Sequence, residues 1–145
     1  MKKKSSFVFT GDIGFDKYME KKWEDKRLIT DGVLRFLHSG DHVVANVEGA
    51  LIDLPPQDDT SGAKQLIHAM NPKAIKVLNN MHADVWSLCN NHILDAGEEG
   101  VAQTLKLAKE NHVQTVGAGM NIEEAARPLL FDEAGGIGLF SVGYR

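Results

Sequence analysis

Short strand-type runs alternate with helix-type segments along this chain, and this alternation constrains the fold more than any other feature. The strand-type runs lie at residues 7–9, 43–45, 84–88 and 114–116. Between the second and third runs, residues 74–81 carry apolar side chains at positions i, i+3, i+4 and i+7, the spacing of one helical face. Strands that alternate with helices of this length predict an α/β fold with at least partly parallel strands.

Local capping signals indicate where two of the helices begin. Asn71 and Pro72 suit the N-cap and the first helical position of the helix that carries the 74–81 stripe. Asp31 is expected to cap a short helix within residues 31–39.

The second half of the chain holds a further helix signal and a hairpin signal. Asp95 and Glu98 have the spacing of a capping box, so we assign Asp95 to a helix start rather than to catalysis. A diglycine turn is expected to join residues 129–131 to 137–142 as a hairpin. Elsewhere along the chain, we expect a surface loop at 53–63, a strand at 65–69 and a short helix at 122–126.

The composition is that of an ordinary globular domain, with 145 residues of which 43% are hydrophobic and 25% charged. We therefore expect residues 1–145 to belong to one domain. A net charge of −4 argues against a nucleic-acid partner, and the single cysteine, Cys89, allows no internal disulfide. The apolar run at 7–9 is shorter than the roughly 7–15 residues of a signal peptide or the roughly 20 of a membrane span, so as written the chain is expected to be cytoplasmic.

Three of the expected strands end in polar or acidic residues that a structural turn does not require. These strand ends are Gly11-Asp12, Asn46-Val47-Glu48 and Asn90-Asn91-His92. Binding sites in open α/β sheets collect at the carboxyl ends of strands. A metal site built from oxygen and nitrogen donors needs ligands from separate rigid elements in this way.

Each of these motifs also has a structural explanation. A Gly-Asp turn after a strand is common, Glu48 can face water at the rim, and Asn46 can close a turn through its side chain. The run from Asn90 to His92 is the hardest to explain structurally, because a turn needs one asparagine and rarely adds a histidine. The combination of the three motifs, rather than any one of them, indicates a site.

In their order and spacing, these motifs resemble those of CapA-type proteins, the family of poly-γ-glutamate capsule synthesis. Residues 9–12 resemble the opening motif of the family, residues 46–49 its second motif, and residues 90–97 its third. Residues 117–128 resemble the segment that follows. The resemblance runs from about residue 7 to the end of the chain.

The resemblance implies a fold related to calcineurin-like metallophosphoesterases, with layered β-sheet and flanking helices. This chain is expected to be the N-terminal portion of such a domain, incomplete at the C-terminus. By the same resemblance, Asp12 matches the first-metal aspartate, Glu48 stands in place of the bridging carboxylate with Asn46 close by, and Asn91 matches the second-metal asparagine. His92 matches the catalytic histidine that steadies or protonates the reacting group.

Two divalent metal ions are therefore the implied cofactors. Carboxylate and amide oxygens suit Mn²⁺ or Mg²⁺, whereas additional histidines shift the preference toward Fe or Zn. The implied substrate is a polyanionic polymer or a phosphoester. We expect no nucleic-acid partner and no membrane segment in this chain, and we leave a homo-oligomer open.

The sequence also departs from the metallophosphoesterase pattern. Gly14 stands where those enzymes have a histidine, the later histidine motifs would lie after Tyr144, and His68 has no assigned role on its expected strand. Three interpretations follow. The complete protein is a metal-dependent hydrolase, or it is a non-enzymatic component of a capsule polymer assembly complex, or this chain is an inactive fragment whose exposed sheet edge makes it aggregate or dimerise.

Overall fold

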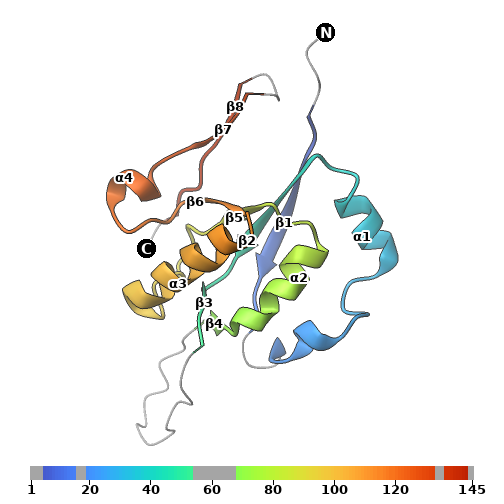
Figure 1. Cartoon of the computed structure of the whole chain (residues 1–145). Helices are drawn as coiled ribbons and strands as arrows, with labels where there is room; N and C mark the ends of the chain where they lie inside the picture. The colour runs from blue at the N-terminus through green and yellow to red at the C-terminus, as the bar shows by residue number, and fades with distance from the viewer. Residues whose placement is uncertain (1–4, 16–18, 54–67, 133–135, 144–145) are drawn as a thin grey trace, which may run out of the picture.

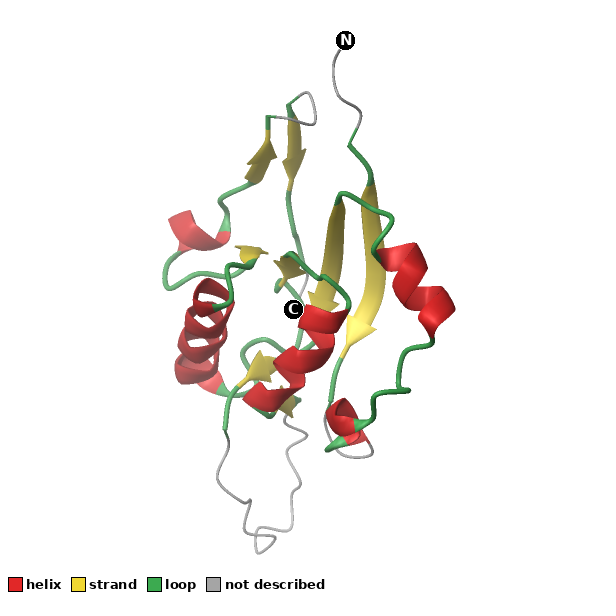
Figure 2. Ribbon diagram, turned by 45° about the vertical axis from the view of Figure 1, so that its right-hand side comes forward, coloured by secondary structure: helices red, strands yellow, loops and turns green. Residues whose placement is uncertain are grey.

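A four-stranded parallel sheet forms the centre of the computed structural model (Figures 1 and 2). The structure describes residues 5–15, 19–53, 68–132 and 136–143. Its strands are β1 (Phe7–Ile13), β2 (His42–Val47), β5 (Val85–Ser87) and β6 (Gln114–Val116), and they lie in the order β1-β2-β5-β6. Each neighbouring pair runs parallel. The prediction of an α/β fold with parallel strands is therefore confirmed.

The helices follow the predicted segments, and of the caps predicted at Asn71 and Asp31 one is confirmed and one is wrong. They are η2 (Lys22–Glu24), α1 (Asp31–Leu37), η3 (Pro72–Ala74), α2 (Ile75–Asn80), α3 (Gly97–Glu110) and α4 (Ile122–Ala125). Asn71 caps η3 as predicted, and its side chain accepts a hydrogen bond from the Lys73 N–H over 3.0 Å. The prediction that Asp31 is an N-cap is wrong, because Thr30 accepts from the Val33 N–H and Asp31 is already helical.

Two smaller strand pairs flank the main sheet. β3 (Ala50–Leu51) pairs in parallel with β4 (Ala69–Met70). Of the strand predicted at 65–69, the structure describes residues 68 and 69, and only Ala69 lies in β4. β7 (Leu129–Phe131) and β8 (Ile137–Leu139) form the predicted antiparallel hairpin. Most of the predicted loop at 53–63 and residues 133–135 of the hairpin turn lie outside the described residues.

The two faces of the main sheet pack against different elements. On one face, strand side chains pack with those of three helices: Val43, Ala45, Val47, Trp86, Leu37, Leu78 and Val101. On the other face, a smaller cluster joins the sheet to the β7-β8 hairpin: Val44, Val85, Val116 and Phe131. Helices therefore cover one face, and the hairpin packs on the other (Figures 1 and 2).

A bulge in β1 brings the first polar motif into register with the second. Phe9 pairs with Val44, but Asp12 pairs with Asn46, so three steps along β1 match two steps along β2. The extra residue shifts the pairing by one position, as in a β-bulge. Asp12 therefore lies within β1, beside Asn46, and not after the strand as the sequence suggested.

Candidate functional site

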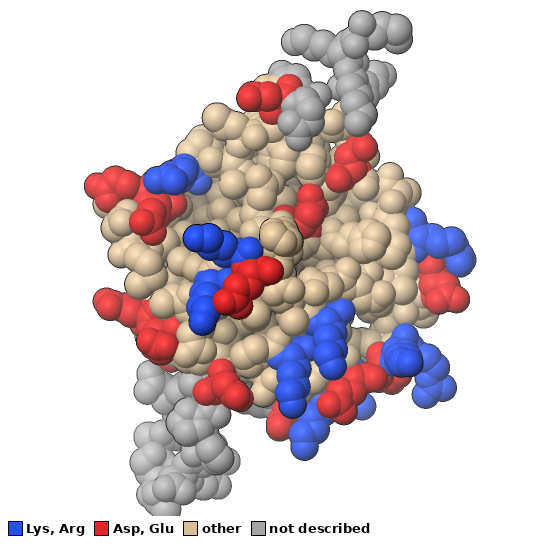
Figure 3. All heavy atoms as spheres, viewed as in Figure 1, with Lys and Arg blue, Asp and Glu red and all other residues tan. Residues whose placement is uncertain are grey.

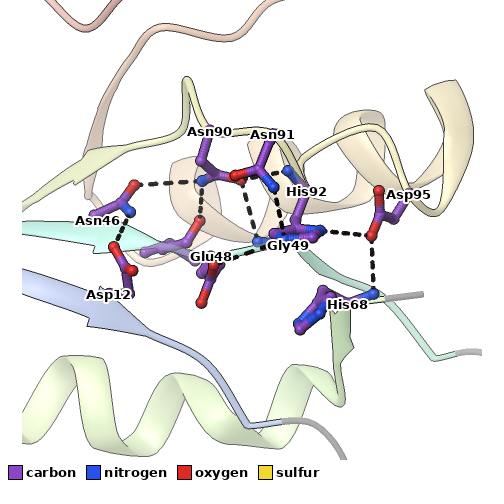
Figure 4. A network of polar contacts seen from close by, with 10 residues as sticks. Asp12, Asn46, Glu48, Gly49, His68, Asn90, Asn91, His92 and Asp95 are labelled. Atoms are coloured by element: carbon purple, nitrogen blue, oxygen red, sulfur yellow. Dashed lines mark hydrogen bonds and ion pairs between the residues drawn. The ribbon is translucent and has the colours of Figure 1, made fainter. Parts of the chain in front are cut away.

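Side chains from the carboxyl ends of β1, β2 and β5 form one network of polar contacts (Figure 4). Asn46 on β2 donates a hydrogen bond from Nδ2 to Oδ1 of Asp12 on β1 over 2.6 Å. Asn90, which follows β5, donates from Nδ2 to Oδ1 of Asn46 over 3.3 Å. The three motifs therefore lie together at one edge of the sheet.

Asn90 connects the two halves of this network. Its Nδ2 also donates to the Val47 carbonyl oxygen over 2.8 Å, and its Oδ1 accepts from the backbone N–H groups of Gly49 at 3.4 Å and His92 at 3.1 Å. One half-buried amide therefore fixes the loop after β5 to the end of β2. This role was missed from the sequence, where Asn90 counted only as part of a motif.

His92 lies at the centre of the second half of the network. Its Nδ1 is 2.9 Å from Oδ2 of Asp95, and its Nε2 is 2.7 Å from Nδ2 of Asn91. Glu48 approaches from β2, with Oε1 3.9 Å from Nε2 of His92. The side chains of His92 and Glu48 are 22% and 28% exposed, so both can be reached from solvent.

The structure corrects the role predicted for Asp95. The N-cap of α3 is Ala96, which makes no side-chain capping bond, and Asp95 turns back toward His92. Its Oδ2 also accepts a hydrogen bond from the His68 backbone N–H over 3.0 Å. The capping-box prediction is wrong because two N–H donors lie within reach of this carboxylate, and it accepts from them rather than from the start of the helix.

The surroundings of Asp95 favour its charged form. Burial raises the pKa of this carboxyl, but the hydrogen bonds from the His68 N–H and the His92 ring, with the charges of both histidines, outweigh burial. The pKa of Asp95 therefore lies below its usual value, and its carboxylate is ionised at neutral pH.

His68, which the sequence left without a role, lies against the site. Its ring centroid is 3.9 Å from that of His92, with an angle of 40° between the ring planes. His68 directly precedes β4, so the β3-β4 pair brings a third chain segment to the network.

The comparison with known families identifies the chain. Residues 6–145 match the profile of the family described as bacterial capsule synthesis protein PGA_cap. The chain belongs to the PGA_cap family. The match covers the whole of the polar network described above.

Named relatives of this PGA_cap chain agree with that assignment. The PGA biosynthesis protein CapA of Bacillus subtilis (strain 168) is 30% identical over 145 residues, which cover 96% of this chain and 37% of the relative. The capsule biosynthesis protein CapA of Bacillus anthracis is 26% identical, with 97% of this chain and 34% of the relative covered. A probable polyglutamine synthesis accessory protein of Mycobacterium tuberculosis is 34% identical over 46% of this chain and 18% of its own length. The chain thus spans about a third of the two CapA proteins.

The donor atoms of this PGA_cap site suit a hard divalent cation. Asp12 and Glu48 offer carboxylate oxygens, and Asn46 and Asn91 offer amide oxygens, which are ligands that Mg²⁺ and Mn²⁺ accept. Among the described residues, no three side chains of His, Cys, Asp and Glu gather closely enough to hold a metal ion. A metal at this edge would therefore need the amide oxygens as well as the two carboxylates.

A groove at the surface lies beside the network. Asn46 lines a groove of about 300 Å³ together with apolar side chains, among them Phe9, Val44 and Phe140.

Within the described part of the chain, no helix has the length and apolarity needed to cross a membrane.

Sequence reasoning assigned no separate role to Asn90 or His68, and it placed Asp95 at a helix start. A signal for Asp95 was present, because a histidine followed three residues later by an aspartate places both side chains on one side of a tight turn. No comparable signal was available for His68, since its approach depends on the pairing of β3 with β4.

Proposed function

We propose that this chain forms the metal-binding edge of a CapA-type protein of capsule or poly-γ-glutamate biosynthesis. In this proposal, the complete protein is a metal-dependent hydrolase with metallophosphoesterase-like layering, and its substrate is a polyanionic capsule polymer or a phosphoester. The observation that carries the proposal is the continuous polar network from Asp12 through Asn46 and Asn90 to His92. The names of the two CapA relatives supply the capsule context.

In this proposal, Asp12, Asn46, Glu48 and Asn91 hold the metal. A bound divalent metal lowers the pKa of a water molecule and polarises an oxygen of the substrate. The chain itself supplies the orientation of the donor groups. The 2.6 Å hydrogen bond from Asn46 fixes one oxygen of Asp12, and Asn90 in turn fixes the amide of Asn46.

His92 is the proposed proton-transfer group. Its Nε2 lies on the same side as Glu48, 3.9 Å from Oε1, whereas its Nδ1 faces Asp95. Nε2 is therefore the ring atom that can exchange a proton with a nucleophile or a leaving oxygen, and it does so only when its 2.7 Å contact with the Asn91 amide opens. Asp95 fixes the orientation of the ring through its 2.9 Å contact with Nδ1.

Metal binding by the purified chain tests this proposal. The wild type and two variants, Asp12→Ala/His92→Ala and Asp31→Ala, are stripped with chelator and titrated with Mn²⁺ by calorimetry, with metal content measured by mass spectrometry. Asp31 is an exposed acidic residue on α1, so its variant controls for loss of surface charge.

We expect stoichiometric Mn²⁺ in the wild type and in Asp31→Ala, and binding weakened by roughly 10-fold or more in the double variant. Folding of each variant is checked by circular dichroism. A wild-type chain that binds no Mn²⁺ in excess metal overturns the proposed metal site.

A second candidate function is a non-enzymatic component of a capsule assembly complex. The observation that favours it is the name of the Mycobacterium tuberculosis relative, which is called a probable polyglutamine synthesis accessory protein. In that case the chain would bind metal but would turn over neither p-nitrophenyl phosphate nor polyglutamate. Hydrolysis of either compound that is lost in His92→Ala would exclude this alternative.

A further inference from the structure

We propose that Asp95 is a positioning residue that sets the orientation of the Asn91 amide through the ring of His92. This inference rests on the proposed function, in which the oxygen of Asn91 faces a metal ion. It concerns three side chains in a row, Asp95, His92 and Asn91, joined by contacts of 2.9 and 2.7 Å (Figure 4).

The first step is the placement of one proton on His92. The Asp95 carboxylate can only accept hydrogen bonds, so Nδ1 of His92 must donate across the 2.9 Å contact. A neutral imidazole has a single N–H, and Nε2 is then an acceptor. Glu48 would favour the opposite placement, with the proton on Nε2, but its Oε1 is 3.9 Å away and the nearer carboxylate prevails.

The second step is the selection of one end of the Asn91 amide. An accepting Nε2 binds the NH₂ group of Asn91, which lies 2.7 Å away. The amide oxygen is then at the other end of the group, and within the described part of the chain it accepts no hydrogen bond. With the proton on Nε2 instead, the oxygen would turn to the ring and the NH₂ group would face outward. A metal ion binds the oxygen and not the NH₂ group, so the proton on His92 decides whether Asn91 can be a ligand.

The third step is what holds Asp95 in place. Its side chain is 12% exposed, and the same oxygen that contacts His92 also accepts from the His68 backbone N–H over 3.0 Å. The His68 ring packs against the His92 ring at 3.9 Å. The segment before β4 therefore fixes the carboxylate and limits rotation of the imidazole, and the arrangement is built into the fold before any ligand binds.

Nuclear magnetic resonance of ¹⁵N-histidine-labelled protein tests the proposal directly. Long-range ¹H–¹⁵N correlations at pH 8, above the usual histidine pKa of about 6.5, show which ring nitrogen carries the proton. His38 and His42 are internal references. Nε2 of His38 is 2.8 Å from the Asn80 carbonyl oxygen and must donate, whereas Nδ1 of His42 is 2.7 Å from Oδ2 of Asp84.

We expect His92, assigned with a His92→Gln variant, to be in the Nδ1–H form in the wild type. In Asp95→Asn its two ring-nitrogen signals should move toward each other or exchange places, and Mn²⁺ affinity should fall roughly 10–100-fold. His68→Ala is the matched control, because it removes the ring but keeps the backbone N–H that binds Asp95. This variant should retain the Nδ1–H form.

The outcomes separate this inference from the proposed function. A wild-type His92 in the Nε2–H form, or a tautomer unchanged in Asp95→Asn, overturns the inference whether or not the chain binds metal. Mn²⁺ affinity lost in Asp12→Ala but unchanged in Asp95→Asn also overturns it. A chain that binds no metal but shows the expected tautomers supports the control of His92 by Asp95 and overturns the proposed function alone.

Discussion

At the scale of single residues, Asp95 couples the site to the stability of the fold. Its carboxylate accepts from one backbone N–H and one imidazole, and these contacts join the loop after β5 to the segment before β4. Protonation of the carboxylate would remove its charge and weaken both contacts. The free energy of unfolding must therefore depend on the ionisation of this group.

We predict that Asp95 contributes pH-dependent stability that Asp95→Asn lacks. The folded-state pKa is lowered, so the contribution is fully present above the unfolded aspartate pKa of about 3.9 and is lost as pH falls through the lower folded-state value. Urea unfolding of both proteins between pH 7 and pH 2.5 measures the difference in unfolding free energy. This difference should shrink as pH falls below about pH 4. A difference that stays the same across the whole range would contradict the prediction.

Part of the network could be predicted from the residue types at the strand ends. The rest could not, because it depends on tertiary contacts. Asp12, Asn46 and Glu48 could be selected because polar motifs follow three expected strands together, and binding sites in open α/β sheets collect at the carboxyl ends of strands. Asp95 was misassigned because a carboxylate at this spacing serves equally as a helix cap or as the partner of a histidine. Only the positions of competing N–H donors decide between the two, and those depend on tertiary contacts.

At the scale of elements, Gly49 controls how closely the β3-β4 pair approaches the site. Its φ is +82°, and a Cβ at this position would collide with the backbone carbonyl of His68. Because that same residue donates its N–H to Asp95, a displaced His68 would also loosen the network. Gly49 thus combines a backbone conformation that favours glycine with a close contact that only glycine permits.

We predict that Gly49→Ala destabilises the chain much more than Gly97→Ala. Gly97 also has a positive φ, +67°, but a Cβ there meets nothing within 4 Å. The control should therefore cost only the backbone strain of about 1–2 kcal/mol, whereas Gly49→Ala adds the steric displacement and should cost about 3 kcal/mol or more. Unfolding in urea measures both losses. Equal losses would show that the contact with His68 adds nothing.

The elements themselves were more predictable than their boundaries. Short strand-type runs predicted β2, β5 and β6, and apolar side chains at helical spacing predicted α2, because both signals are local. The bulge in β1 was not predictable, because one extra residue in a strand leaves the local pattern unchanged and appears only in its pairing with β2. That bulge is what brings Asp12 beside Asn46.

At the scale of the whole molecule, the two faces of the main sheet differ in how they meet solvent. The side seen in Figure 1 carries α2 and α3, and its acidic and basic side chains are interspersed (Figure 3). The opposite face carries the β7-β8 hairpin, and large apolar side chains beside it remain exposed: Phe9 at 62%, Phe140 at 64% and Val142 at 89%. All three line the same groove of about 300 Å³. The sequence predicted the sheet but could not show which face the helices would leave uncovered.

These exposed side chains predict that the isolated chain self-associates as its concentration rises. Contiguous exposed apolar surface favours association, and burying one phenylalanine side chain contributes about 1.5–3 kcal/mol. A Phe9→Ser/Phe140→Ser variant should therefore weaken association at least roughly 10-fold, as measured by sedimentation velocity over a concentration series. Phe36→Ser is the matched control, because Phe36 is 65% exposed but lies on α1, away from the groove. If all three proteins associate equally, or if Phe36→Ser has the same effect as the double variant, the groove face is not the surface that drives association.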